Sequence, residues 1–147
     1  MPLKKLEVHT LGNNGDDLSD QLAGFEQIYS VLQKLTLLKA FLNDDQLCRI
    51  RAKYINFPVG HITPYGVIQF IRDWIEGRRN DYLGLCLNYT MSDGFNHFII
   101  FRAFGNDYIR ENHPPFRIRQ RAPNRGIATI SAIRQGNDVT FEFNALQ

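Results

Sequence analysis

The spacing of apolar residues changes near residue 80, and this change restricts the folds that the chain can adopt. Before that point apolar side chains recur every three or four positions, which is the spacing of one face of a helix. After it they alternate with polar side chains, which is the period of a strand. Helices followed by strands are typical of an α+β domain. The sequence therefore predicts N-terminal helices packed on a C-terminal antiparallel sheet.

Three helices are expected in the first part of the chain. Apolar residues at helical intervals predict a long helix, and the "NDD" that follows it is typical of a cap before a second helix. Thr63 followed by Pro64 is a typical start for the third helix, and Gly77 is a typical end. The three expected helices span about 18–42, 44–54 and 64–76.

Five strands are expected after the third helix, separated by turns rich in Gly, Pro, Asn and Asp. The run 95–104 is apolar on both faces, which favours a central strand with cover on each side. This order of elements is similar to that of cone-like folds such as nuclear transport factor 2, an analogy of shape that implies a curved sheet and no particular function. The expected strands span 82–90, 95–104, 116–122, 126–134 and 139–144.

Length and composition predict one ordinary globular domain over residues 1–147. Apolar residues make up 44% and charged residues 22%, which is the composition of a protein with a buried core. Two cysteines, Cys48 and Cys86, are too few for a disulfide framework or a four-ligand zinc site. The chain shows neither a signal-peptide pattern nor a run of about 18 apolar residues. We therefore expect a cytoplasmic protein that does not engage a membrane.

The sequence lacks the common motifs for cofactor and metal binding. No two glycines are spaced as in G-x-G, and H-E-x-x-H, G-x-S-x-G and C-x-x-C are missing too. The acidic stretch "NNGDDLSD" has Leu18 and Gly24 where a calcium loop counted from Asn13 needs Gly and Glu. We therefore expect no cofactor and no bound metal, and we interpret this stretch as a turn that caps a helix.

The stretch "HPPFRIRQRAPNRG" is the strongest candidate for a binding site. In a strand, its arginines at alternate positions would point to one face. Between residues 110 and 134 six arginines stand against a single acid, although the net charge of the chain is only +2. Arginine forms bidentate contacts with carboxylate and phosphate groups. The predicted anion-binding or partner-binding residues are Arg110, Arg117, Arg119, Arg121 and Arg125.

Two interpretations of the arginine-rich strand are open. As a site, it would engage an acidic protein surface or nucleic acid phosphates, with Arg102 extending it and Tyr82, Tyr108 and Phe116 as stacking groups. As an ordinary outward face, its arginines would pair with Glu142 or other acids on neighbouring strands, or would guard an edge strand against aggregation. We predict a small non-enzymatic binding module that engages an acidic protein or a nucleic acid.

A small hydrolase is the alternative prediction. Cys48 near the start of a helix, His97 on a strand and Asp107 beyond it resemble the general plan of papain-like cysteine hydrolases. The start of a helix lowers the pKa of a thiol, which would activate the cysteine. A buried thiol and a hydrogen-bonded core histidine are the simpler interpretation of these residues. Two loop histidines, His61 and His113, would instead equip a metal-independent nuclease.

The last strand is a candidate surface for a homodimer. Val139, Phe141 and Phe143 alternate there with Thr140 and Glu142, which is typical of a strand that is half exposed. A half-exposed strand that contains aromatic residues favours contact with a second copy of the chain.

Overall fold

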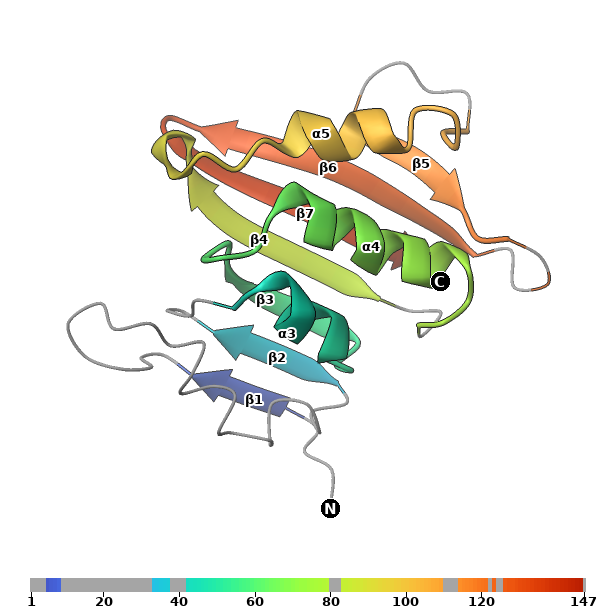
Figure 1. The fold of residues 1–147 in the computed structure, drawn as a ribbon, viewed down its shortest axis with the longest axis horizontal. Helices are drawn as coiled ribbons and strands as arrows, with labels where there is room; N and C mark the ends of the chain where they lie inside the picture. The colour runs from blue at the N-terminus through green and yellow to red at the C-terminus, as the bar shows by residue number, and fades with distance from the viewer. Residues whose placement is uncertain are drawn as a thin grey trace.

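The computed structural model describes residues 5–8, 33–37, 42–79, 83–109, 114–121, 123 and 126–146. These residues form one mixed sheet with helices packed on it (Figure 1). The strands are β1 (Lys5–Val8), β2 (Lys34–Leu37), β3 (Tyr54–Pro58), β4 (Gly84–Thr90), β5 (Phe116–Arg119), β6 (Ile127–Gln135) and β7 (Asp138–Leu146). The helices are α3 (Asp44–Arg49), α4 (Pro64–Ile75) and α5 (His97–Ala103), with a short 3-10 turn η1 (Met91–Asp93).

Neighbouring strands are parallel in one half of the sheet and antiparallel in the other. The strand order is β1-β2-β3-β4-β7-β6-β5, in which β1 to β4 pair in parallel and β4, β7, β6 and β5 pair antiparallel. The expected α+β class is confirmed. The expected sheet of about five antiparallel strands is wrong, because the described residues form seven strands in a mixed sheet. The sheet is not closed, so it does not form the expected cone.

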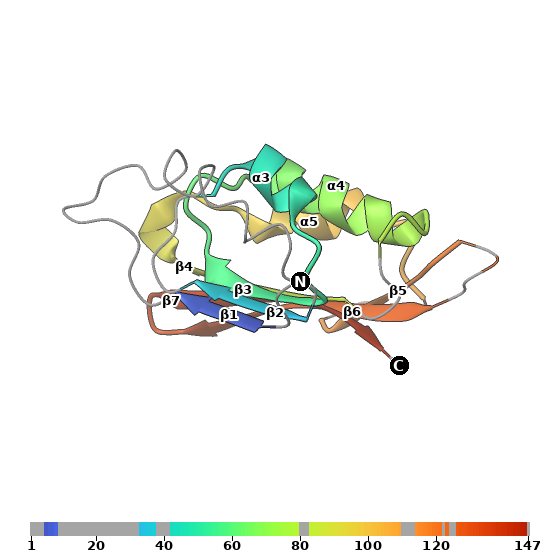
Figure 2. The same ribbon diagram turned by 90° about the horizontal axis from the view of Figure 1, so that it is seen from below.

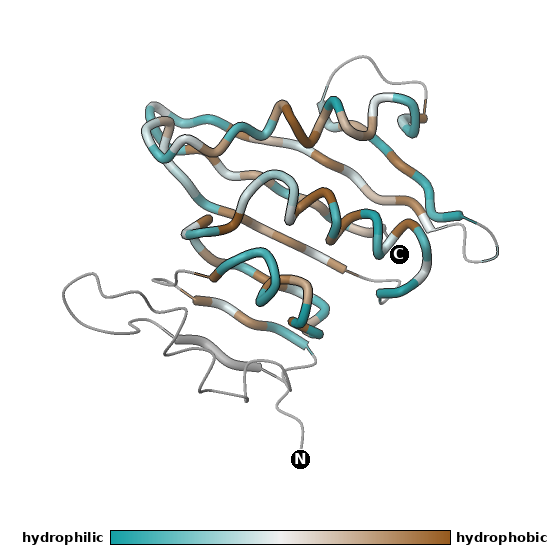
Figure 3. The backbone as a smooth tube through the Cα atoms, in the orientation of Figure 1, coloured by the Kyte–Doolittle hydropathy of each residue, from teal (hydrophilic) through white to brown (hydrophobic). Residues whose placement is uncertain are grey.

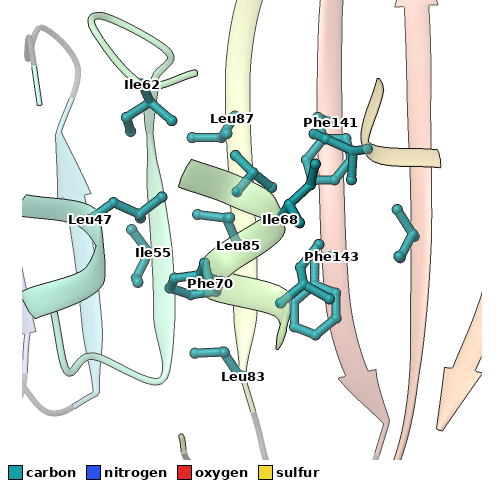
Figure 4. Packing of buried hydrophobic residues seen from close by; sticks show 14 of the residues in the cluster. Leu47, Ile55, Ile62, Ile68, Phe70, Leu83, Leu85, Leu87, Phe141 and Phe143 are labelled. Atoms are coloured by element: carbon teal, nitrogen blue, oxygen red, sulfur yellow. The ribbon is translucent and has the colours of Figure 1, made fainter. Parts of the chain in front are cut away.

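The three helices of the described residues lie on one face of the sheet (Figure 2). Beneath them a row of apolar residues crosses six strands, and each member pairs with the next in the sheet register: Leu35, Ile55, Leu85, Phe143, Ile130 and Phe116. The α4 side chains Trp74 and Phe70 meet Phe143 edge-on, with ring centroids 5.3 and 6.5 Å away. Figure 4 shows this packing, and Figure 3 shows hydrophobic and polar positions alternating along the strands. The core therefore lies between the helices and one sheet face.

The position of α4 confirms the expected third helix over 64–76. The Thr63 side chain accepts a hydrogen bond from the Gly66 amide over 3.4 Å, and Pro64 occupies the first turn. Gly77 follows the helix with a φ of 77°, the left-handed conformation that ends many helices. All the local signals in this segment therefore agree with its packing on the sheet.

The second helix, α3, is shorter than the expected helix over 44–54. It begins with a capping box, in which the side chains of Asn43 and Gln46 each accept a hydrogen bond from the other residue's amide over 2.9 Å. It ends at Arg49, and residues 54–58 form β3 instead, because alternate residues of that segment are buried against the helices.

The expected helix over 18–42 is wrong where the structure describes it. Residues 34–37 form β2, which pairs in parallel with β1 and β3. The two leucines of β2 are buried on one face, so their spacing is that of a strand. Residues 18–32 and 38–41 lie outside the described residues.

The expected central strand over 95–104 is also wrong, because residues 97–103 form α5. The Asn96 side chain caps this helix by accepting a hydrogen bond from the Phe98 amide over 3.0 Å. A run that is apolar on both strand faces also fits a short helix with one buried face. The buried residues of the segment are Ile100, Phe101 and Phe104, which is the spacing of a helix face.

The four other expected strands are confirmed with shifted ends, and they form β4, β5, β6 and β7. The last strand is half exposed as expected, but the exposed half is the polar row, because Val139, Phe141 and Phe143 are buried beneath the helices. Both edges of β7 are paired, to β4 and to β6. The aromatic row of the last strand therefore does not provide the expected surface for a second copy of the chain.

Candidate binding face of the sheet

Two of the predicted arginines project from β5 on the sheet face opposite the helices, which we call the open face. Arg117 and Arg119 are exposed, whereas Phe116 is half-buried and Ile118 is fully buried. This alternation points the guanidinium groups away from the helices. By alternation and register the open face includes Lys34, Thr36, Tyr54, Asn56, Pro58, Gly84, Cys86, Asn88, Thr90, Arg117, Arg119, Ile127, Thr129, Ser131, Ile133, Gln135, Asp138, Thr140, Glu142 and Asn144.

Although β5 is the last strand of the sheet, its outer side is partly paired. The Ile109 amide donates a hydrogen bond to the Arg117 carbonyl over 2.9 Å. Tyr108 forms an isolated antiparallel bridge with Ile118. The backbone of residues 108 and 109 therefore takes up part of the hydrogen-bonding edge that an outer strand would otherwise leave open.

Arg121 takes a different position, just beyond β5. Its amide donates a hydrogen bond to the Ile75 carbonyl over 2.9 Å, and its guanidinium lies 2.7 Å from a Glu76 carboxylate oxygen at the end of α4. The expected ladder of three arginines therefore has two members on the open face and a third in an ion pair with a helix end. Glu142, the acid expected to pair with the arginines, lies on β7, and β6 separates β7 from β5.

Arg117 is the last member of a row that crosses the open face. Consecutive members pair with one another in the sheet register, so their side chains share this face. The row has a cation at each end and no acidic member. We call it the cross-strand row: Lys34, Tyr54, Gly84, Asn144, Thr129 and Arg117.

The Tyr54 ring packs over Gly84 of the neighbouring strand. A Cβ atom at Gly84 would lie 2.8 Å from a carbon of this ring, so glycine leaves room for the ring. The Lys34 ammonium lies 5.5 Å from the ring centroid, within the range of a cation–π contact. Burial raises the pKa of the Tyr54 hydroxyl, which therefore stays protonated at neutral pH. This end of the cross-strand row combines a cation with an aromatic ring.

The acidic residues of the open face lie outside the cross-strand row. Glu142 belongs to the next row of paired residues, and Asp138 lies farther along β7 at the turn from β6. Cys86 pairs with Glu142 in the register, and burial together with this carboxylate raises the pKa of its thiol to about 11. The side-chain amide of Asn88 donates a hydrogen bond to the side-chain oxygen of Asn56 over 3.0 Å. The open face is therefore cationic along one row and acidic toward its other end.

The predicted Cys48–His97 pair is not brought together. Cys48 lies on α3 and His97 on α5, and α4 lies between these two helices (Figure 1). Burial raises the pKa of the Cys48 thiol, which is the opposite of the activation that a nucleophile needs. Asp107 lies in the turn after α5, where its amide donates a hydrogen bond to the Phe104 carbonyl over 2.8 Å.

A polar cavity of about 440 Å³ adjoins Cys48 at the ends of α3 and α4. Its lining includes Arg79, whose guanidinium donates hydrogen bonds to three carbonyls at the end of α3 over 2.7, 2.8 and 3.3 Å. The same guanidinium lies 4.1 Å from the Phe70 ring centroid. Arg78 forms an ion pair of 2.8 Å with Asp73. These contacts are those of a helix cap, so a structural role accounts for the charges of this cavity.

His97 contacts Tyr89 at the start of α5. The Tyr89 hydroxyl lies 2.5 Å from the Nδ1 atom of His97. Burial lowers the pKa of His97 and raises that of Tyr89, so the hydroxyl donates to a neutral imidazole at neutral pH. The neutral ring then carries its proton on Nε2. His97 is therefore a hydrogen-bonded histidine at the edge of the core, among the rings of Phe98 and Phe101.

The other predicted histidine site has one member in the described part of the chain. His61 is exposed and forms an isolated bridge with Asn43. His113 lies outside the described residues, and so do the predicted site residues Arg110 and Arg125 and the stacking candidate Tyr82. Among the residues that the structure describes, no group of His, Cys, Asp and Glu side chains is placed to hold a metal ion.

The sequence argument named only Arg117 of the cross-strand row as a site residue, and it placed two other members in helices. Lys34 was placed in a helix expected over 18–42, and Tyr54 at the end of one expected over 44–54. The signal that would have found them is alternation: "KLTL" and "YINF" each place polar and apolar residues in turn. Arg102, expected to extend the arginine site, lies on α5 and therefore on the helix side.

Comparison with known proteins gives no match. No protein-family model matches the chain, and neither a curated protein nor a solved structure is significantly similar to it. None of the helices in the described ranges is long and apolar enough to cross a bilayer. The geometry of the open face is therefore the basis for a functional proposal.

Proposed function

We propose that this protein is a binding module that holds an anionic partner on the open face, with Arg117 and Arg119 as the main contacts. The observation that carries this proposal is the exposure of both arginines on a sheet face that no described helix covers. The cross-strand row that ends at Arg117 contains no acid, so an anion laid along it meets a cation at each end. Arginine suits such a contact because its guanidinium matches carboxylate and phosphate oxygens.

A single-stranded nucleic acid fits this face better than a compact acidic surface. The cross-strand row spans five strand spacings, a length of about 24 Å at roughly 4.8 Å each. Its cations are suited to phosphates, and the Tyr54 ring and Asn144 amide are suited to bases. Glu142 and Asp138 repel phosphates from the other end of the open face. These charges favour one extended strand along the row.

A binding role is favoured over hydrolysis by Cys48 because α4 separates this residue's helix, α3, from the helix of His97, α5. Within the proposed role, Arg121 is a minor contact, since its guanidinium lies beyond β5 beside Glu76 at the end of α4 and not on the open face. A cytoplasmic location and self-association of the chain stay predictions of the sequence.

The proposal is tested by reversing the two charges, with Arg117→Glu and Arg119→Glu combined. Fluorescence anisotropy measures binding of a labelled single-stranded oligonucleotide to each protein at several salt concentrations. We expect the slope of log affinity against log salt concentration to fall by about 1.4, because each phosphate contact with a single strand contributes about 0.7. The affinity at low salt is expected to fall at least about tenfold.

The matched control combines Arg72→Glu with Arg134→Glu, which changes the net charge by the same amount. Both arginines are exposed, one on α4 and the other on β6 opposite the core residue Val139. The control should bind the oligonucleotide nearly as the wild type does. An equal loss in both double variants, or no loss in either, overturns the proposal. If a polyglutamate peptide binds with the same arginine dependence and the oligonucleotide does not, the partner is an acidic protein.

A further inference from the structure

A groove on the helix side, between α5 and β5, is separate from the open face. It has a volume of about 470 Å³, and its described lining is mostly aromatic: Phe98, Phe101, Tyr108 and Phe116, with Arg102, Gly105 and Pro114. Phe116 points toward the helices, whereas the next residue, Arg117, points to the open face. The groove and the cross-strand row therefore lie on opposite sides of β5, and either can be altered without the other.

The inner wall of the groove is fixed by contacts among its rings. Tyr108 and Phe116 stack with centroids 4.3 Å apart and planes at 8°, and Phe101 meets Phe116 edge-on at 5.1 Å. The Tyr108 hydroxyl donates a hydrogen bond to the Phe101 carbonyl over 2.5 Å, so its polar atom already has a partner. A wall formed in advance loses little conformational freedom when a ligand binds.

Phe98 forms the outer part of the groove and is 57% exposed. Its ring meets Phe101 edge-on at 6.1 Å and lies 4.4 Å from the His97 ring. A large exposed ring beside buried and half-buried rings is typical of a surface that receives an apolar ligand. A planar ring is the shape that such walls favour, because aromatic pairs gain from stacked and edge-on contacts beyond the burial of area.

Arg102 supplies the only charge among the described lining residues, and it is exposed at the groove. A ligand whose ring packs on the aromatic wall can therefore direct an anionic group to this guanidinium. The groove also has the size of a small-molecule site. We propose that it binds a small planar aromatic carboxylate, with Phe98 and the Tyr108–Phe116 stack contacting the ring and Arg102 contacting the carboxylate.

Two probes separate the two parts of this site: 2-naphthoate and its uncharged counterpart 2-naphthalenemethanol. Both are titrated into the full-length protein, and isothermal calorimetry gives the affinities. We expect the carboxylate to bind at least about tenfold more tightly, because only it forms a charge-assisted contact with Arg102. Arg102→Gln should remove this difference, and Phe98→Ala should weaken both probes by about fivefold or more.

Matched controls come from the exposed side of α4. Tyr65→Ala removes an exposed ring and Arg72→Gln removes an exposed arginine, and both should bind 2-naphthoate as the wild type does. The proposal is overturned if the wild type binds neither probe at millimolar concentration. It is also overturned if Arg102→Gln and Phe98→Ala, shown by circular dichroism to be folded, bind like the controls. Arg102→Gln leaves the open face intact. Oligonucleotide binding by this variant therefore tests the proposed function independently of the groove.

Discussion

The two faces of the sheet are built from alternate residues of the same strands, yet they have different environments. On β7, Phe141 and Phe143 are buried beneath α5 and α4, whereas Glu142 between them lies on the open face. On β5, Ile118 is buried and the arginines on either side of it are exposed. One short segment therefore contributes to stability through one set of side chains and is available for binding through the other.

This contrast predicts different consequences for substitutions on the two faces. Truncating a side chain on the helix side removes buried contacts and leaves a cavity, which lowers the free energy of unfolding. Truncating an exposed side chain on the open face removes a group that already contacts water, so stability changes little. The variants below test this contrast, beginning with the largest expected effect.

Trp74→Ala should cause the largest loss of stability. Trp74 is completely buried, and its ring meets Phe143 edge-on at 5.3 Å. Its removal leaves a cavity between α4 and β7, so we expect the free energy of unfolding to fall by about 3–5 kcal/mol in denaturant titrations. Arg119→Ala on the open face should change it by at most about 0.5 kcal/mol. A similar loss in both variants would show that the open face is part of the core.

Gln120→Ala tests a buried polar contact between helix and sheet. The Gln120 side chain donates a hydrogen bond to the Trp74 carbonyl over 2.8 Å and accepts one from the Gly126 amide over 3.1 Å. Its truncation leaves both backbone groups without this partner, so we expect a loss of about 1–3 kcal/mol in the same titrations. Gln135→Ala, at an exposed glutamine of β6, is the control and should be nearly neutral. An equal effect of the two changes contradicts the prediction.

Cys86 gives the stability a dependence on pH. Burial and Glu142 raise the pKa of its thiol to about 11, whereas a thiol in an unfolded chain titrates at about 8.5. The folded protein therefore favours the protonated thiol, and this stabilisation is complete below about pH 8.5 and is lost as the pH rises toward 11. We expect the free energy of unfolding to fall by about 1–2 kcal/mol between about pH 8 and pH 10.

Urea titrations at each pH measure this decline in the wild type and in Cys86→Ala. The decline should be shallower in the variant, because the thiol that binds the extra proton is gone. Burial raises the pKa of Cys48 as well, so the same titrations of Cys48→Ala measure how much the second thiol contributes to the decline. If the free energy of unfolding falls as steeply with pH in Cys86→Ala as in the wild type, groups other than Cys86 cause the pH dependence.

Arg121→Ala should have the smallest effect. The ion pair between Arg121 and Glu76 is 2.7 Å long but lies at the surface, so its loss should cost about 0.2–1 kcal/mol. The cost should shrink at high salt, because ions screen exposed charges. Unfolding titrations at low and high sodium chloride concentration measure both values. A cost that does not change with salt would indicate a contact other than the ion pair.

The parts of the fold that were predictable are those where local signals agree with the packing. In α4 a capping threonine, a first-turn proline, an apolar stripe and a closing glycine all indicate the same helix. In β6 and β7 alternation alone was sufficient, because these strands have one buried and one open face. Arg117 and Arg119 were correctly placed on one face for the same reason.

The errors fall where a local pattern fits both periods. The leucines of β2 belong to a run that also has helical spacing, and pairing with β1 and β3 decides in favour of a strand. The run 95–104 is apolar at most positions, and only the cap at Asn96 marks it as a helix. The pairing of Arg121 with Glu76 could not be predicted either, because α4 is distant in sequence and is brought to β5 by tertiary packing.

The partly paired edge of β5 determines which groups of this strand a partner can contact. With the Arg117 carbonyl bonded to the Ile109 amide, a foreign strand cannot extend the sheet at that position through main-chain hydrogen bonds. Recognition at this position of β5 is therefore left to side chains, which are Arg117 and Arg119 on the open face and Phe116 in the groove. Selection can then change the preferred partner one residue at a time, while the backbone of the sheet stays as it is.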